Sequence, residues 1–260
     1  MRRSPWEATT TVGVVGFGRL GRLLVRYFAH DVRMFVYDPR PNPRKVRALG
    51  ATPVTMAEAA RQDLVLICVP IVAFEGAVRR LAPHVRRDAI VVDTCSVKEH
   101  PVRVMKRWLP KSVDILATHP NFGPDSAAES LEGQKLVVSR VRIASSRWRE
   151  LRGLLEDKGL VIVELTPREH DRRMAQSLVL THFIGRTLIR YGSEPTGVDT
   201  EGYKRLLRIL QTVQNDSWQL FEDMNRYNAF AAPMRRKLLA SMKAVDRKVR
   251  AHPSEARRVL

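Results

Sequence analysis

Short apolar runs alternate with helix-like segments through the first two-thirds of the chain. The runs have strand length and end at a glycine, a turn or a polar residue, whereas apolar residues between them recur at three- and four-residue spacings. The expected strands are Val12–Val15, Arg33–Tyr37, Leu64–Val69, Ala89–Asp93, Ile115–Ala117, Lys135–Val138 and Leu160–Glu164, and the expected helices include Leu20–Ala29 and Arg44–Leu49. Strands that alternate with helices predict an α/β fold, with a doubly wound parallel sheet covered on both faces.

The pattern changes at Thr166. The sequence T-P-R-E places Thr166 at a helix N-cap, Pro167 at the first helical position and Glu169 where its side chain can reach back to the cap. Beyond this point apolar residues keep helical spacing and strand signals are nearly absent. We therefore expect an α/β domain over residues 1–165 and an all-α domain over residues 166–260. Because the second segment is short for an independent core, its helices are expected to bury apolar faces against a second subunit.

Composition narrows the class of protein. The chain has 260 residues, which suits one large or two modest domains, and no stretch approaches the roughly 20 apolar residues of a membrane span. The N-terminus lacks the apolar run of a signal peptide. The two cysteines, Cys68 and Cys95, have neither a disulfide framework nor a metal-ligand spacing, and we expect two small buried thiols. These features predict a cytoplasmic protein without a membrane partner.

The formal net charge of +18 raises the question of nucleic-acid binding. The basic residues are spread along the chain and mixed with acids, and no run of aromatic residues interleaves with them. We therefore do not expect nucleic acid as the main partner. A positive field would equally attract an anionic substrate and cofactor. The basic tail from Met234 to Leu260 is expected to be a solvated helix face.

A glycine motif follows the first expected strand and opens the first expected helix. Gly16, Gly18 and Gly21 form G-x-G-x-x-G, in which the glycines permit a tight turn, a close approach of pyrophosphate and close helix–strand packing. Asp38 ends the second strand, where an acid binds the ribose hydroxyls of NAD, while nearby Arg40 could accept the 2′-phosphate of NADP. A plain tight turn and a turn-forming aspartate are the competing explanations. The residues assigned to the cofactor are Gly16, Phe17, Gly18, Arg19, Leu20, Gly21, Asp38, Arg40, Val69, Pro70 and Thr94.

The loop A-T-H-P-N-F-G-P-D-S holds one titratable ring, His119, among rigid turn residues. Loops at the carboxyl ends of parallel strands line the ligand crevice, so His119 should meet the loop D-T-C-S-V-K of residues 93–98 there. We predict His119 as the general base, since a neutral imidazole accepts a proton near physiological pH. Ser96 would orient that ring by a hydrogen bond and, with Lys98, face the nicotinamide. A structural histidine locked by the turn is the alternative.

Two more histidines follow the capping box. His170 and His182 are twelve residues apart, about 120° around an α-helix, so they do not share a face. His170 lies in the first turn, where positive charge is disfavoured, and is expected to contact the facing domain. His182 lies in an apolar stretch and is either a satisfied core histidine or a substrate ligand. Neither has a partner at the spacing of a zinc site, and we predict no metal.

Together these motifs resemble the prephenate/arogenate dehydrogenases of tyrosine biosynthesis. The similar segments are the glycine loop, D-T-C-S-V-K, T-H-P-N-F-G-P-D-S, E-H-D-R-R-M-A and T-H-F, and the match runs from about Val12 to about Asn228. The later segments T-E-G-Y-K-R-L-L, N-D-S-W-Q-L-F and R-Y-N look like the branch that includes plant arogenate dehydrogenases.

The resemblance implies an NAD(P)-binding Rossmann domain followed by a helical dimerisation domain, and a homodimer. It implies that an anionic cyclohexadienol is oxidised at C4, with hydride passing to the nicotinamide and loss of the ring carboxylate. His119 would accept the 4-hydroxyl proton, Ser96 would support it, and His182 would lie near the substrate side chain. The residues assigned to the substrate are His182, Arg208, Lys98 and Gln176.

Two features depart from the family pattern. The arginine that many relatives use for a substrate carboxylate falls near Gln211, and Arg208, one turn earlier, is expected to replace it with a bidentate fork. The acid that tends to hold the arogenate amine falls on neutral Gln211 and Thr212, which favours prephenate. We therefore predict an NAD-dependent prephenate dehydrogenase. The alternatives are an arogenate dehydrogenase with NAD or NADP, a dehydrogenase of an amino-substituted prephenate, a 3-hydroxyacid dehydrogenase and a basic NAD-sensing nucleic-acid binder.

Overall fold

The computed structural model describes residues 10–40 and 42–251, which fall into two compact units that divide after Asp171. The division lies inside helix α7 (Pro167–Met174), six residues beyond the expected boundary at residue 165. Each unit is described below by itself. The end of the basic tail lies outside the described residues.

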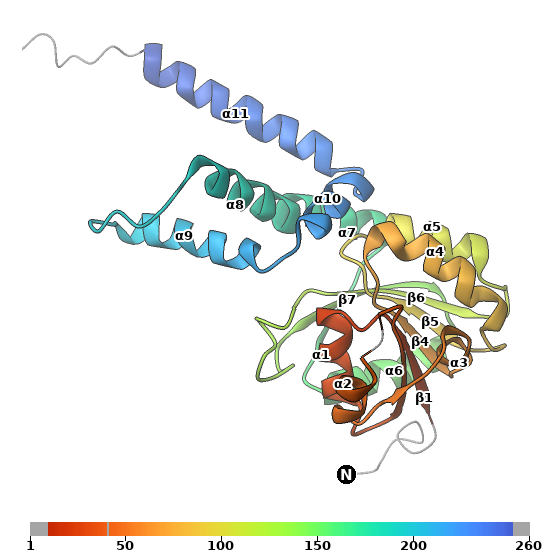
Figure 1. Cartoon of the computed structure of the whole chain (residues 1–260). Helices are drawn as coiled ribbons and strands as arrows, with labels where there is room; N and C mark the ends of the chain where they lie inside the picture. Colours follow the sequence, from red (N-terminus) through yellow and green to blue (C-terminus); the bar gives the residue numbers. More distant parts are fainter. Residues whose placement is uncertain (1–9, 41, 252–260) are drawn as a thin grey trace, which may run out of the picture. The chain divides into compact units, whose positions relative to one another are not determined.

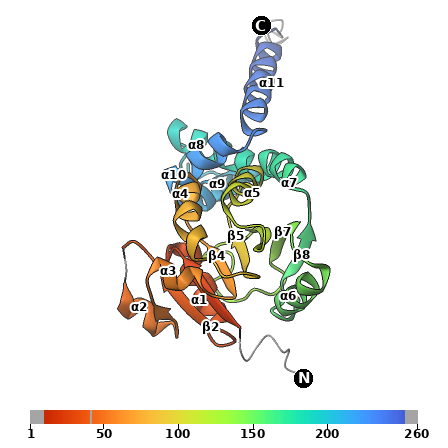
Figure 2. The same ribbon diagram turned by 90° about the vertical axis from the view of Figure 1, so that its right-hand side faces the viewer.

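A single sheet forms the centre of the first unit (Figures 1 and 2). Within the described residues it has eight strands in the order β3-β2-β1-β4-β5-β6-β7-β8. Their bounds are β1 Thr11–Val15, β2 Arg33–Tyr37, β3 Thr52–Pro53, β4 Leu64–Ile67, β5 Ile90–Asp93, β6 Asp114–Pro120, β7 Lys135–Arg142 and β8 Val161–Glu164. The first six strands pair in parallel, as expected. The prediction of parallel pairing is wrong at β7, which runs antiparallel to β6, with β8 parallel to β7.

Helices connect the strands of the first unit. They are α1 Arg19–Phe28, α2 Pro43–Ala48, α3 Met56–Ala60, α4 Ile71–Leu81, α5 Glu99–Trp108 and α6 Ser145–Asp157. Local chemistry explains several of their starts: the Asn42 side chain accepts the Lys45 N–H at the start of α2, and Thr55 and Glu58 form a reciprocal capping box on α3. Helix α4 packs beside α5, and α6 packs beside β8 (Figure 2).

The core of the first unit lies between the sheet and its helices. Val14 and Val36 on the strands, Leu23 on α1 and Trp148 on α6 belong to one buried apolar cluster. All four residues of β5 are buried, which is the pattern of a central strand covered on both faces. A rigid central sheet of this kind holds the loops at its carboxyl edge in fixed positions.

The second unit is helical. A five-residue π-helical segment, Ala175–Val179, joins α7 to α8, and the unit continues through three more helices within the described residues. The bounds are α8 Leu180–Tyr191, α9 Glu201–Gln214, α10 Trp218–Tyr227 and α11 Ala231–Ala251. Because π-helix has a different pitch from α-helix, the angle of about 120° expected between His170 and His182 does not apply.

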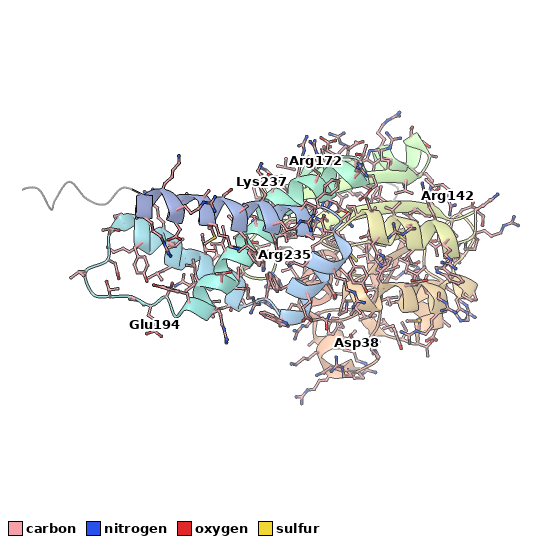
Figure 3. All side chains as sticks on the ribbon, turned by 90° about the horizontal axis from the view of Figure 1, so that it is seen from above. Asp38, Arg142, Arg172, Glu194, Arg235 and Lys237 are labelled. Atoms are coloured by element: carbon pink, nitrogen blue, oxygen red, sulfur yellow. The ribbon has the colours of Figure 1, made fainter. Side chains whose placement is uncertain are left out.

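Close packing organises these helices. Helix α8 packs against α9 at Gly185, where a Cβ atom would press on Val213, and it ends at Gly192 in the left-handed conformation (φ 87°). A small core of Val179, Met224 and Met234 joins the π-helical segment to α10 and α11. Figure 3 labels Arg235 and Lys237 on α11. In the described part of the chain, no helix is long and apolar enough to cross a membrane.

Candidate active site

Parallel strands bring the sequence-predicted groups of the first unit to one edge of the sheet. Gly16 follows β1, Val69 follows β4, Thr94 follows β5, and His119 lies at the carboxyl end of β6. The Thr94 hydroxyl donates to the carbonyl of Ile67 (3.0 Å), so it bridges the ends of β4 and β5. This edge is therefore a continuous line of loops that presents the glycine motif and the histidine loop together.

The three glycines of the motif meet different surroundings. Gly16 has a φ of +105°, and a Cβ atom on it would overlap the carbonyl oxygen of Cys68. A Cβ atom on Gly21 would overlap the carbonyl oxygen of Gly16. At Gly18, by contrast, nothing lies within 4 Å of the Cβ position. The fold itself requires the first and third glycines, whereas the second leaves open space at the N-terminus of α1, which fits the approach of a pyrophosphate.

Asp38 ties the end of β2 to the glycine loop. Its Oδ2 accepts the Phe17 N–H (2.7 Å), and its Oδ1 accepts the Arg40 N–H (2.8 Å). The Arg40 side chain is exposed, as is that of Arg19, whose guanidinium bonds both carboxylate oxygens of Asp125 (2.9 Å each). The contact between Arg19 and Asp125 joins the glycine loop to the loop that follows His119. Of the remaining residues assigned to the cofactor, Phe17 is buried, Leu20 and Val69 are half-buried, and Pro70 is exposed.

Lys98 lies in the interior, not at a substrate-facing surface. Its side chain is 0% exposed, and its ammonium pairs with the buried carboxylate of Asp93 and donates to the carbonyl of Thr118. Burial raises the pKa of Asp93, and the Lys98 charge opposes that rise. The structure therefore accounts for Lys98 as a buried counter-ion that joins the ends of β5 and β6, which corrects the expectation that it faces the nicotinamide and binds the substrate.

The His119 ring forms a chain of contacts with the start of α7. His119 Nδ1 lies 2.9 Å from His170 Nε2, and His170 Nδ1 lies 2.8 Å from Oδ1 of Asp171. Asp171 in turn accepts the N–H groups of Lys98 (2.7 Å) and Glu99 (2.9 Å), at the N-terminus of α5. His119 is 6% exposed, and both His170 and Asp171 are 0% exposed. All of these contacts lie within the first unit.

Burial sets the charge state of both rings. It lowers the pKa of His119 well below its ordinary value, and the neighbouring His170 and Lys98 act in the same direction. Burial and the Lys98 charge lower the pKa of His170 to about 3. Both imidazoles are therefore neutral at physiological pH, and each has one donor and one acceptor nitrogen.

Sequence reasoning found His119 but missed its partners. Ser96, which was expected to orient the ring, is half-buried and makes no hydrogen bond to His119 in the described part of the chain. His170, expected to contact the facing domain of residues 1–165, does so by lying against the His119 ring. The E-H-D sequence at the start of a capped helix was the available signal, because a histidine followed by an aspartate there can place a carboxylate on a ring nitrogen.

Of the three residues predicted for the second unit, His182 is buried in a cluster with Asp216, and the other two are exposed. His182 is 2% exposed, and its Nε2 lies 3.5 Å from Oδ2 of Asp216. One turn along α8, the Arg186 guanidinium lies over the rings of Trp218 (5.4 Å) and Phe221 (6.0 Å) and donates to the carbonyl of Asp216. Burial lowers the pKa of His182, which keeps its ring neutral. The remaining predicted residues of this unit, Gln176 and Arg208, are exposed.

Residues 25–164 match the family model described as prephenate dehydrogenase, nucleotide-binding domain, and residues 187–259 match that described as TYRAAT1-like, C-terminal domain. The chain is 31% identical to arogenate dehydrogenase 2, chloroplastic, of Arabidopsis thaliana over 92% of this chain and 69% of the plant protein. It is 29% identical to a probable prephenate dehydrogenase [NADP(+)] of Schizosaccharomyces pombe over 68% of this chain and 42% of the yeast protein.

A similar solved structure is the crystal structure of prephenate dehydrogenase from A. aeolicus in complex with hydroxyphenyl propionate and NAD+. The TM-score is 0.73 at 20% sequence identity, and the alignment covers 96% of this chain and 93% of the other. This likeness establishes a common fold: a Rossmann-type sheet with helices, followed by a helical region.

Proposed function

This chain belongs to the prephenate dehydrogenase family of NAD(P)-dependent oxidoreductases, and from that premise we propose that it converts prephenate to 4-hydroxyphenylpyruvate with NAD. In this reaction the C4 hydrogen leaves the ring as hydride, and the 4-hydroxyl group gives up its proton. The ring carboxylate leaves as CO₂, and its bonding electrons complete the aromatic ring. Bound NAD supplies the hydride acceptor.

The buried, neutral imidazole of His119 is the observation that carries the proposal. Its Nδ1 is engaged by His170, so Nε2 is the nitrogen left for a substrate proton. The depressed pKa of His119 keeps the ring neutral at physiological pH, so one of its nitrogens is free to accept a proton. His119 would accept the 4-hydroxyl proton as hydride leaves and return it to the phenolate after decarboxylation. Ser96, half-buried on the preceding loop, is proposed as a second polar group beside the reacting hydroxyl.

The glycine loop supports the binding of NAD. The open space at Gly18 and the N-terminus of α1, with its partial positive charge, suit a pyrophosphate. Asp38 would hold the ribose hydroxyls, and its negative charge would disfavour the 2′-phosphate of NADP. The exposed Arg40 side chain is the feature that would allow NADP. The other proposed contacts are Phe17, Arg19, Leu20, Val69, Pro70 and Thr94.

For the helical unit we propose that His182 and an arginine bind the anionic side chain of the substrate. The arginine position of the family falls near Gln211, and Arg208, the replacement expected one turn earlier, has an exposed side chain. Arg186 shares α8 with His182, and its guanidinium is held by two aromatic rings and a carbonyl group. Since Arg186 lies one turn from the buried His182 and its guanidinium is oriented for a carboxylate, Arg186 is the better candidate. Gln176 is proposed as a further polar contact.

Arogenate is the second candidate substrate, because a plant arogenate dehydrogenase is among the relatives. The deciding experiment follows the absorbance of reduced cofactor with prephenate and with arogenate, each in the presence of NAD and of NADP. We expect the highest kcat/KM with prephenate and NAD. A higher value with arogenate would transfer the assignment to that substrate, and a higher value with NADP would refute the role of Asp38. No turnover by folded protein that binds NAD would contradict the proposed reaction.

The role of His119 is tested by His119→Asn. We expect turnover to fall by about 10²–10⁴-fold, the usual contribution of a general base, while the Kd for NAD stays unchanged. His84→Asn is the matched control, because His84 is exposed on the surface of the first unit. Near-normal turnover of His119→Asn would remove His119 from the base role.

We further propose a cytoplasmic homodimer. Neither cysteine forms a disulfide, which fits a reducing compartment. For the dimer, the apolar stripe of α11 begins in the small helical core with Met234 and continues at helical spacing through Met242, Val245 and Val249, which are 55%, 63% and 71% exposed. At 100° per residue, Arg236, Lys243, Arg247 and Arg250 of α11 lie on the opposite side of the helix, so a second copy that covers the stripe would leave these four charges in solvent.

Sedimentation velocity tests the dimer. We expect the wild-type chain to sediment as a dimer and the Val245→Glu variant as a monomer, because a buried unpaired carboxylate opposes association. Val198→Glu is the control, since Val198 is 87% exposed in the loop between α8 and α9. A monomeric wild-type chain would refute the proposal.

A further inference from the structure

The direction of every hydrogen bond between α5 and His119 can be assigned from groups whose roles are fixed. The backbone N–H groups of Lys98 and Glu99 are obligatory donors, and they point at both carboxylate oxygens of Asp171. The ionised Asp171, held by these two N–H groups and the nearby charge of Lys98, accepts, so His170 Nδ1, at 2.8 Å, carries a proton. A neutral His170 then offers a lone pair at Nε2, which accepts from His119 Nδ1–H at 2.9 Å.

We propose that the Asp171–His170 pair is a positioning device that holds His119 in the Nδ1–H tautomer, with the lone pair on Nε2. The proposal rests on the proposed function, because it states which nitrogen of the general base receives the substrate proton. Asp171 and His170 touch neither substrate nor cofactor in this role. They act through His119, as the aspartate of a catalytic triad acts through its histidine.

The same chain supplies an acceptor for the protonated ring. When His119 Nε2 accepts a proton, the imidazolium formed donates more strongly from Nδ1 to His170, which transmits the charge to the carboxylate of Asp171. The groups that face His119 are His170 and Asp171 on α7 and Lys98 before α5. Burial, His170 and the charge of Lys98 all lower the pKa of His119 and so oppose protonation of the ring; Lys98 is itself paired with Asp93 on β5. Asp171 is thus the anion at the far end of the chain of contacts, next to His170.

The arrangement also explains why the start of α7 lies where it does. The N-terminus of α5 leaves backbone N–H groups without helical partners, and Asp171 satisfies two of them. One carboxylate therefore both caps α5 and orients His170. A change at Asp171 has two consequences, a loss of stability at α5 and a change of tautomer at His119, and only the second belongs to the proposal.

The experiment that separates these consequences is ¹⁵N NMR of the histidine ring nitrogens in the full chain without substrate. The chain has seven histidines, and His119→Asn identifies the signals of His119. In the wild-type protein we expect a protonated Nδ1 and an unprotonated Nε2 at neutral pH. A protonated Nε2 on His119 would overturn the proposal. This NMR measurement requires neither a variant of Asp171 nor any enzymatic turnover.

The Asp171→Asn variant provides the second readout. The amide removes the negative charge that fixes the proton on His170 Nδ1, and if its nitrogen takes the place of Oδ1 it donates to His170 and puts the proton of His119 on Nε2. We expect turnover to fall by about 10²-fold or more while the Kd for NAD stays unchanged. Asp157→Asn, the same change at an exposed position of α6, is the control. If Asp171→Asn lowers thermal stability but leaves the His119 tautomer and kcat intact, the pair is merely structural and the proposal is refuted.

The outcomes also separate this inference from the proposed reaction. The predicted tautomer in a protein that turns over neither prephenate nor arogenate would leave the positioning device standing and contradict the reaction. Turnover of prephenate by a protein whose His119 has the opposite tautomer would support the reaction and contradict the positioning device.

Discussion

Single residues of the glycine loop differ in what they do for the fold. Gly16 and Gly21 leave no room for a Cβ atom because backbone carbonyl groups occupy its place, whereas the Cβ position of Gly18 is open. The sequence pattern treats the three as one motif. Their surroundings separate two glycines that allow the backbone to fold from one whose only visible use is to leave space for a ligand.

This difference predicts opposite phenotypes for two similar variants. Gly21→Ala should lower the free energy of unfolding by about 1–3 kcal/mol, the usual cost of overpacking, as measured by urea unfolding. Gly18→Ala should keep the wild-type free energy of unfolding but raise the Kd for NAD, which isothermal titration calorimetry measures. Equal NAD affinity of Gly18→Ala and the wild-type protein would show that the pyrophosphate does not approach this residue.

At the scale of helices, packing decides which arginine lies beside His182. Helix α8 places Arg186 one turn from His182, and Trp218 and Phe221 of α10 support its guanidinium. Periodicity shows that two residues share a helix face, but it does not show which side chain the neighbouring helix holds in place. The choice between Arg186 and Arg208 therefore depends on the packing of α8, α9 and α10.

Two matched substitutions test that choice. Arg186→Lys should raise the KM for prephenate by about tenfold or more, because lysine lacks the planar fork that stacks on the rings and binds a carboxylate at two points. Arg208→Lys should change KM little. The reverse result would return the role to Arg208, and wild-type kinetics in both variants would contradict carboxylate binding by either arginine.

The pH dependence of stability is a property of the whole molecule. Burial lowers the pKa of His170 to about 3, and unfolding returns it to about 6.5. Above pH 6.5 the ring is neutral in both states and has no effect. Below that value the unfolded chain binds a proton that the folded chain does not, so the free energy of unfolding falls as the pH falls, by about 1.4 kcal/mol per pH unit for one such group.

Urea unfolding between pH 6.5 and 5 measures this loss. We expect a steeper decline for the wild-type protein than for His170→Asn, because the variant lacks the depressed group while the Asp93–Lys98 pair is common to both. Equal slopes would mean that His170 is protonated in the folded protein. That result would also contradict the neutral ring on which the assigned hydrogen-bond directions depend.

Much of the fold could be predicted because its signals are local. The seven expected strands are confirmed, as are the helices after β1 and β2, since each depends on alternating or β-branched residues within a short window. Strand β3 and helix α3 were missed because they are only two and five residues long. The direction of β7 was wrong because antiparallel pairing with β6 depends on the path of the intervening loop, which has no periodic pattern.

The sequence by itself determined the fold class, the glycine motif and His119 as the ring to examine, because each has a signature within about twenty neighbouring residues. Only the tertiary structure decided the partners of that ring. His119 and His170 are 51 residues apart, and Lys98 and Asp171 are 73 apart, yet they form one buried network. A short-range pattern cannot specify such contacts, because they arise only when the sheet and α7 bring their ends together and exclude water from the charges between them.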